Sequence, residues 1–240
     1  MERRHLAECG STNTEALAHL RQGGGPLLLS ASRQTAGRGR LGRAWHSEAA
    51  GADAALTFSV AQPLPATLDL SGLSLAVGCT VADALEPNGN RIRLKWPNDL
   101  VLDGAKLGGI LIEAVPLPDG QRGVVIGIGL NLRPLPPDAD RSAFASGHAA
   151  LHILDPAATP ASTLDRLALA LRGLLADFAE LGFGPWQAAF SRRDLTAGQR
   201  VRIGDQTGTA RGVSVRGELL LDTDHGLVPC SGGELSLRMA

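Results

Sequence analysis

A short segment near the N-terminus, residues 37–43, has the composition of an anion-binding loop. In its sequence GRGRLGR the glycines free the backbone, and each arginine guanidinium can hold a carboxylate or a phosphate through two hydrogen bonds. Backbone N–H groups and side chains of such a loop can converge on one anion. We therefore predict an anion-binding loop that becomes ordered when its anion arrives. A solvated flexible loop and an RNA-binding arginine segment are the alternatives for this segment alone.

The sequence KWPND, residues 95–99, brings a lysine, an amide and a carboxylate together around a proline. The residue before a proline favours extended backbone, so Trp96-Pro97 predicts an extended turn that presents Asn98 and Asp99. Lys95 can contact a phosphate, and the two polar side chains after the proline can bind a nucleotide hydroxyl or a magnesium ion. A polar turn stabilised by its own Asn and Asp side chains is the alternative.

Two glycine-containing segments predict strands that a ligand can approach closely. Lys106 stands at the start of one strand, and a pair of glycines that ends at Gly109 follows it. In the other strand Gly127 and Gly129 alternate with large apolar residues, and Asn131 supplies a buried polar group that needs a partner. The alternatives are a solvated lysine in the first strand and a β-bulge in the second.

Residues 11–13, with the sequence STN, place two hydroxyls and an amide at a predicted helix start. Such residues are helix caps by default, and they can equally direct donors and acceptors at a small polar ring. The sequence shows no Ser/His/Asp, Cys/His or His-rich spacing of the kind used in nucleophilic or metal catalysis. The candidate residues that converge are basic: Arg38, Arg40, Arg43, Lys95 and Lys106. Basic groups without a nucleophile suit a reaction in which two anions must meet, as when a carboxylate attacks the α-phosphate of ATP.

The elements expected to position these residues are a mixture of strands and helices. Periodicity predicts helices at residues 12–22, 70–85, 162–181 and 186–192, and strands at residues 27–32, 55–61, 92–96, 100–115 and 123–132. Because strands outnumber helices and do not alternate regularly with them, we expect an α+β fold with a mixed, largely antiparallel sheet.

Local signals mark the ends of several elements. Thr12 and Glu15 form a predicted capping box, and Ser162 marks the predicted start of a later helix. The sequence PLP, residues 63–65, is expected to end the second strand. Asp103-Gly104 between two apolar runs predicts a hairpin turn.

The last part of the chain has a different pattern. From Leu195 onward it consists of five short β-like pieces separated by Gly or Asp turns. This spacing predicts a small β-barrel. We therefore expect two domains, a catalytic domain over residues 1–193 and a barrel over residues 194–240.

The overall composition excludes some classes of protein. The net charge is −1 and the pI is about 6.6, so the basic excess of a protein that binds nucleic acid through the phosphates is missing. The three cysteines are far apart, which predicts reduced thiols in an intracellular compartment. Neither a signal peptide nor a run of apolar residues long enough to span a membrane is evident. We expect a soluble cytoplasmic protein that binds neither nucleic acid nor membranes.

Taken together, five motifs resemble those of the biotin protein ligases, also called biotin–[acetyl-CoA-carboxylase] ligases. They are STN (11–13), QTAGRGRLGRAW (34–45), KWPND (95–99), KLGGIL (106–111) and GIGLN (127–131), in the family's order and spacing. The resemblance implies a class II synthetase-like catalytic domain and a C-terminal SH3-like barrel. It also implies that biotin and MgATP form biotinoyl-5′-AMP, and that a lysine of a biotin carboxyl carrier protein then takes the biotin.

The resemblance also implies roles for individual residues. The biotin pocket would contain Ser11, Thr12, Asn13, Gln34, Gly37, Arg38, Gly39, Arg40, Lys106, Gly109 and Gly127. The ATP or adenylate site would contain Arg40, Arg43, Trp45, Lys95, Asn98, Asp99, Lys106 and Asn131. Lys106 and Arg40 would be the catalytic residues, and Asp99 would contact magnesium.

Other functions are compatible with parts of the same sequence. Many bacterial members carry an N-terminal DNA-binding domain, whereas this chain starts almost directly at the catalytic part, so we expect a ligase without repressor activity. A homodimer is compatible with the family. Lipoate protein ligases share the fold and the adenylate chemistry, a nucleic-acid-binding regulator could use the arginine loop, and a catalytically inactive biotin sensor would lack Arg40 or Lys106.

Overall fold

The computed structural model describes residues 1–45, 53–136, 146–233 and 235–237. The chain forms two compact units, of which the first comprises Met1–Leu68 with Leu102–Ala168 and the second Asp69–Val101 with Leu169–Ala240. Each unit therefore contains segments that are far apart in the sequence. The predicted boundary at residue 193 divides the chain by sequence position, whereas these units group residues that are close in space. The boundary therefore stays a prediction.

The first unit is built on a mixed sheet. Its strands are β1 (Glu2–Cys9), β2 (Leu27–Gln34), β3 (Ala55–Pro65), β7 (Gln121–Asn131) and β6 (Ala105–Pro116), and they neighbour one another in that order. β1 and β2 are parallel, as a strand–helix–strand connection requires, and the other neighbours are antiparallel. The predicted α+β fold with a mixed, largely antiparallel sheet is confirmed.

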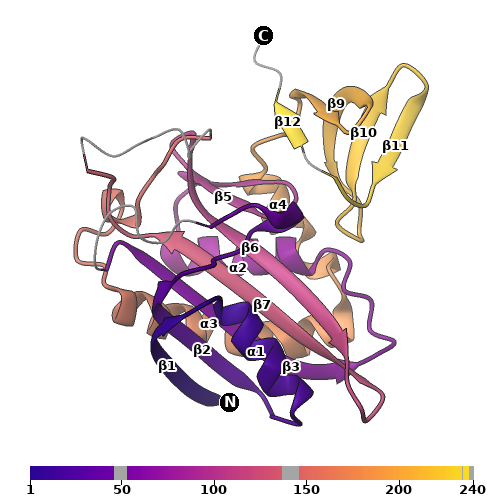
Figure 1. Cartoon of the computed structure of the whole chain (residues 1–240). Coiled ribbons are helices and arrows are strands. Elements are labelled where there is room, and N and C mark those ends of the chain that lie inside the picture. Colours follow the sequence, from indigo (N-terminus) through magenta and orange to yellow (C-terminus); the bar gives the residue numbers. More distant parts are fainter. Residues whose placement is uncertain (46–52, 137–145, 234, 238–240) are drawn as a thin grey trace. The chain divides into compact units, whose positions relative to one another are not determined.

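The helix α1 (Thr12–Arg21) connects β1 to β2 and lies against β2, β3 and β7 (Figure 1). Its apolar residues Ala16, Leu17 and Leu20 lie on one side of the helix and face the sheet. The resulting core contains Ala16, Leu17, Leu20, Leu27, Leu29, Ala61 and Val125. Burial of this apolar stripe fixes the first turn of α1 against the sheet, and that turn carries the STN motif.

Two local predictions in this unit are wrong and one strand was missed, each for an identifiable reason. Thr12 is the first residue of α1 and Ser11 is its N-cap, without a side-chain cap, so the Thr12–Glu15 capping box does not form. β3 continues to Pro65 and stays paired with β7 to that end; its prolines lie beyond the segment that pairs with β2, where one side of the strand is an edge that tolerates proline. β1 was not predicted, since it is an edge strand whose side chains are mostly exposed.

The remaining helices and strands that precede the C-terminal sheet begin and end close to their predicted residues. They are α2 (Leu73–Leu85), β4 (Ile92–Lys95), β5 (Asp99–Leu102), α3 (Pro160–Leu181) and α4 (Gln187–Arg193), with short 3-10 turns at Arg40–Gly42, Leu151–Ile153 and Gly184–Trp186. α3 begins two residues before the predicted Ser162, with a proline in its first turn, where no N–H is needed. Asp103 and Gly104, which join β5 to β6, both have positive φ, as the predicted two-residue turn requires.

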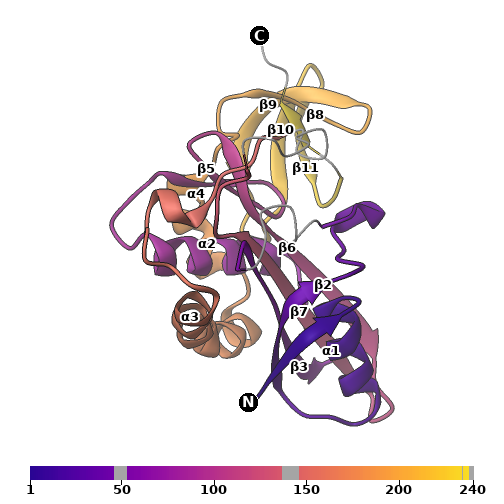
Figure 2. The same ribbon diagram turned by 60° about the vertical axis from the view of Figure 1, so that its left-hand side comes forward.

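The C-terminal sheet belongs to the second unit. Its strands are β8 (Arg200–Ile203), β9 (Gln206–Val213), β10 (Leu219–Thr223), β11 (Gly226–Cys230) and β12 (Leu235–Leu237), and their order is β11-β10-β9-β8-β12 (Figure 2). Every neighbouring pair is antiparallel. The five predicted strands are confirmed.

A buried arginine, Arg193 at the end of α4, organises the rest of the second unit. Its guanidinium donates to the Asp83 and Glu86 carboxylates and to the carbonyl oxygens of Glu86 and Ile92. The arginine side chain is only 6% exposed. It therefore joins the end of α2, the start of β4 and α4 through one fully used guanidinium. Among the described residues, no helix is long and apolar enough to cross a membrane.

Candidate active site

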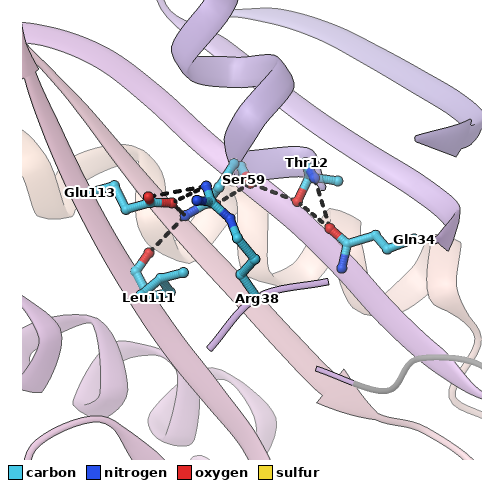
Figure 3. A network of polar contacts seen from close by, with 7 residues as sticks. Thr12, Gln34, Arg38, Ser59, Leu111 and Glu113 are labelled. Atoms are coloured by element: carbon cyan, nitrogen blue, oxygen red, sulfur yellow. Dashed lines mark hydrogen bonds and ion pairs between the residues drawn. The ribbon is translucent and has the colours of Figure 1, made fainter. Parts of the chain in front are cut away.

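Four polar residues form a cluster beneath the first turn of α1, called here the α1 cluster: Thr12, Asn13, Gln34 and Ser59. The Thr12 backbone N–H and hydroxyl both donate to Gln34 Oε1, at 2.7 and 3.1 Å. Ser59 Oγ lies 2.8 Å from Thr12 Oγ1 and 2.6 Å from Asn13 Oδ1 (Figure 3). All four residues are buried, so these contacts form where water cannot substitute for a missing partner.

The α1 cluster has fewer protons than contacts. Asn13 Nδ2 donates to Leu111 O at 3.2 Å and to Glu113 Oε2 at 2.8 Å, which directs Asn13 Oδ1 toward Ser59. The two hydroxyl protons of Thr12 and Ser59 then serve three contacts, and each hydroxyl has one proton. One of the three contacts therefore lacks a proton of its own, and the oxygens of the cluster keep lone pairs that can accept a further hydrogen bond.

Glycines on β7 leave room for this cluster and for the arginine loop. A Cβ atom on Gly127 would lie 2.2 Å from Asn13 Oδ1, and one on Gly129 would lie 2.5 Å from the Trp45 ring. β6 and β7 pair without a shift of register from Gly108↔Leu130 to Pro116↔Arg122. The alternative explanation of these glycines as a bulge is therefore wrong, and close approach accounts for them.

The arginine loop forms a hydrogen-bonded turn. Gly39 N donates to Arg43 O at 2.7 Å, and Trp45 N donates to Gly37 O at 2.9 Å. Leu41 and Gly42, at its tip, have φ of 56° and 73°. A hollow of about 370 Å³ lies between this loop and β6, lined by Arg38, Gly39, Arg40, Leu41, Gly42, Leu111, Ile112 and Glu113. The loop thus forms one wall of a concave site.

An ion pair joins the arginine loop to the sheet. Arg38 Nη2 donates to both Glu113 oxygens, at 3.1 and 3.0 Å (Figure 3). The Arg38 side chain is 44% exposed and that of Glu113 is 25% exposed. Glu113 therefore contacts the loop on one side and Asn13 of the α1 cluster on the other.

Trp45 closes the loop and covers Gly129 with its ring. Its Nε1 atom is buried and has no hydrogen-bond partner among the described residues. A buried N–H without an acceptor is costly, so this atom is suited to donate to a polar ligand.

Lys106 and Asn131 meet at the start of β6. Asn131 is buried, and its Nδ2 donates to Lys106 O at 3.1 Å, which supplies the partner expected for this residue. The Lys106 backbone also pairs with Ser146 O and Ala149 N. The lysine backbone is thus fixed from three sides, and its side chain is half-buried.

The KWPND motif lies in the second unit and is described there alone. The Trp96-Pro97 peptide bond is cis, and Asn98 N donates to Lys95 O at 3.2 Å, so the predicted turn at the proline is a tight four-residue turn. Trp96 is buried, and its Nε1 donates to Gly217 O at 3.1 Å. This anchor leaves Lys95, Asn98 and Asp99 half-buried.

The described residues contain no group of three or more His, Cys, Asp or Glu side chains that could hold a metal ion. One carboxylate next to one amide oxygen, as at Asn98 and Asp99, still matches the oxygen donors that Mg²⁺ takes when phosphates complete its coordination.

Ser59 and Glu113 were not predicted as site residues. Ser59 interrupts an apolar strand two positions after Thr57, and two hydroxyls on one face of a buried strand are a signal that the sequence did contain. Glu113 lies seven residues after Lys106 in the same strand, and its partners come from remote segments. No local sequence pattern could have assigned these partners to Glu113.

Comparison with known proteins decides between the readings of these motifs. The sequence pattern of the "Biotin/lipoate A/B protein ligase family" matches residues 9–131, which is more than half of the chain. This chain belongs to that family. A second pattern, the "Biotin protein ligase C terminal domain", matches residues 196–238. The family expected from the five motifs is confirmed.

Individual relatives agree with this assignment. The biotin–[acetyl-CoA-carboxylase] ligase of Mycobacterium tuberculosis is 36% identical over 96% of this chain and 86% of its own length. The bifunctional ligase/repressor BirA of Salmonella typhimurium is 34% identical over 88% of this chain, which spans 66% of that protein. The biotin protein ligase of Aquifex aeolicus, solved in complex with biotin and ATP, is 28% identical with a TM-score of 0.79, covering 100% of this chain and 99% of its own.

Proposed function

We propose that this protein is a biotin protein ligase that activates biotin with ATP and transfers it to a lysine of a biotin carboxyl carrier protein. The observation that carries the proposal is the α1 cluster, a buried set of hydroxyl and amide groups that has fewer protons than contacts and packs against Gly127 of β7. The named ligases among its relatives support the same activity.

The α1 cluster suits the head group of biotin, a urea ring with two N–H donors and one carbonyl acceptor. Ser11, Thr12, Asn13, Gln34 and Ser59 present both acceptors and donors in buried surroundings, where hydrogen bonds discriminate strongly. We assign Gly109 and Gly127 to the strand side of the biotin site, and Gly37, Arg38 and Gly39 to its loop side.

The proposed first step joins two anions. The biotin carboxylate attacks the α-phosphorus of ATP, a C–O–P bond forms, the bond to the β-phosphate breaks, and pyrophosphate leaves. Arg40, Arg43 and Lys106 neutralise the repulsion between carboxylate and phosphate and stabilise the charge that develops at phosphorus. No protein nucleophile is required, which agrees with the basic character of the site.

In the second step the lysine amine of the carrier attacks the acyl carbon of biotinoyl-AMP. A C–N bond forms, the bond to AMP breaks, AMP leaves with the electron pair, and the amine loses a proton. The protein's part is to bind both partners and to exclude water from the mixed anhydride.

The nucleotide is assigned to Trp45, Lys95, Asn98, Asp99 and Asn131 in addition to the basic residues. Asp99 would hold magnesium, which supplies charge neutralisation at the phosphates when bound. The proposal retains a catalytic domain over residues 1–193 and an SH3-like domain over residues 194–240. Because the reaction consumes ATP and modifies a carboxylase, we place it in the cytoplasm.

The test is a direct labelling reaction. The protein is incubated with MgATP, a biotin carboxyl carrier domain and either biotin or lipoate, and the carrier is weighed by intact mass spectrometry. The expected result is a single biotin adduct that requires ATP, together with no lipoyl adduct. A lipoyl adduct alone, or no adduct, would overturn the proposed substrate.

A further inference from the structure

One carboxylate, that of Glu113, connects the arginine loop to the α1 cluster. It accepts from Arg38 Nη2 at 3.0 and 3.1 Å and from Asn13 Nδ2 at 2.8 Å. Asn13 continues through Ser59 and Thr12 to Gln34 (Figure 3). A series of polar contacts therefore runs from Arg38 in the loop to Gln34, the last residue of β2.

The two ends of this chain differ in their surroundings. At the α1 cluster the groups are buried, and the Asn13 amide packs so closely against Gly127 that a Cβ there would have no space. At the loop the Arg38–Glu113 ion pair is partly exposed, so water screens the attraction between the two charges. The screened ion pair alone does not hold Arg38 firmly, so we expect the position of the Glu113 carboxylate to influence how well the loop is held against the sheet.

Asn13 controls that orientation. When Asn13 Oδ1 faces Ser59, the two Nδ2 protons of the same amide point at β6. One proton is donated to Leu111 O and the other to the Glu113 carboxylate. A ligand N–H that binds in the α1 cluster and fixes Asn13 therefore also fixes Glu113, and Glu113 fixes Arg38.

We propose that Glu113 is a positioning residue that couples occupancy of the α1 cluster to docking of the arginine loop. Glu113 contacts neither reacting anion in this scheme; it transmits the state of Asn13 to Arg38. The proposal rests on the proposed function for the identity of the ligand, and on the Glu113 contacts alone for the coupling.

The coupling is measured by hydrogen exchange at two amides of the loop, Gly39 and Trp45, which are hydrogen-bonded within it. In the wild type, saturating biotin is expected to slow exchange at both amides by about tenfold, within the usual range of coupling between sites. In Glu113→Gln, which keeps the shape and removes the charge, biotin at saturation is expected to leave both rates nearly unchanged. Full biotin-induced slowing in Glu113→Gln would overturn the proposal.

A matched control is Asp165→Asn. It removes the carboxylate of another ion pair of the first unit, Arg3–Asp165 at 2.7 Å, whose side chains are more than half exposed. It is expected to respond to biotin as the wild type does. By reciprocity, Glu113→Gln is also expected to weaken biotin binding by about the factor lost in loop protection, with kcat at saturating biotin changed less.

A second measurement separates this proposal from the proposed function. If the wild type binds neither biotin nor lipoate, the substrate assignment fails, and the ligand-free protein still tests the coupling. Asn13→Ala and Arg38→Gln should be non-additive in their effect on loop exchange when Glu113 is present, and additive in the Glu113→Gln background. Additivity in both backgrounds would refute a role for Glu113 as the connection.

Discussion

Two arginines of this protein form polar networks of opposite kinds. Arg193, in the second unit, has a side chain only 6% exposed and donates to two carboxylates and two carbonyl oxygens. Arg38, in the first unit, is 44% exposed and contacts the single carboxylate of Glu113. A network with every donor used stabilises the fold, whereas one that leaves acceptors for a further donor suits a ligand.

The comparison predicts that loss of the closed network affects folding. In Arg193→Leu the largely buried Glu86 carboxylate and two carbonyl oxygens lose their donor, and removing one partner of a buried pair costs about 3–5 kcal/mol. Asp83 is 48% exposed, so water can replace its lost contact. The free energy of unfolding from urea denaturation should fall by that amount. Arg192→Leu, on the exposed side of the same helix, should change it little. Equal losses in the two variants would show that Arg193 is not the organising residue.

Loss of a basic residue at the open site should affect activity and leave folding intact. Lys106→Ala removes a proposed countercharge of the biotin carboxylate, and deletion of one such electrostatic contact lowers the rate by about 10²–10³. Pyrophosphate release with biotin and ATP should fall accordingly, while the urea midpoint stays near that of the wild type. Unchanged pyrophosphate release would remove Lys106 from the mechanism.

The chain has only two lysines, Lys95 and Lys106, and both lie in the motifs that carry the family resemblance. This placement, together with the glycine-rich loop, made much of the candidate site predictable from local sequence. The helices α2 and α3 and the C-terminal strands were also predictable, because their apolar periods and turn residues are local signals.

The rest of the site depends on contacts between distant segments. Ser59 and Glu113 acquire their partners only when β3 and β6 are brought beside β7 and α1, across separations of 46 and 100 residues from Asn13. Thr12 was predicted as a cap because hydroxyls at helix starts usually bond to the backbone, but Gln34 offers it a buried side-chain acceptor instead. The edge strand β1 lacks an apolar pattern because little of it is buried.

A smaller effect is expected at Asp194, which follows Arg193 and has one buried oxygen without a partner among the described residues. Burial raises the pKa of the Asp194 carboxyl above its usual 3.8. The folded state then binds more protons than the unfolded state, so this residue lowers stability as the pH rises above 3.8. Asp194→Asn keeps the oxygen that accepts from Thr196 and should gain stability relative to the wild type over that range.

The check is urea denaturation of both proteins at a series of pH values, with the exposed Asp224→Asn as control. The stability difference between Asp194→Asn and the wild type should widen with pH, and the control should show no such trend. A difference that does not vary with pH would mean that the buried carboxylate is not the cause.

The central claim is that the open network of the first unit binds biotin and the closed network of the second unit does not take part. Calorimetric titration of biotin into the wild type, Ser59→Ala and Asp83→Asn tests it most directly. Loss of the Ser59 hydroxyl, which contacts Thr12 and Asn13, should weaken binding by about tenfold, the equivalent of one buried hydrogen bond. Asp83→Asn should bind biotin as the wild type does. Wild-type affinity in Ser59→Ala, or an equal loss in Asp83→Asn, would contradict the account.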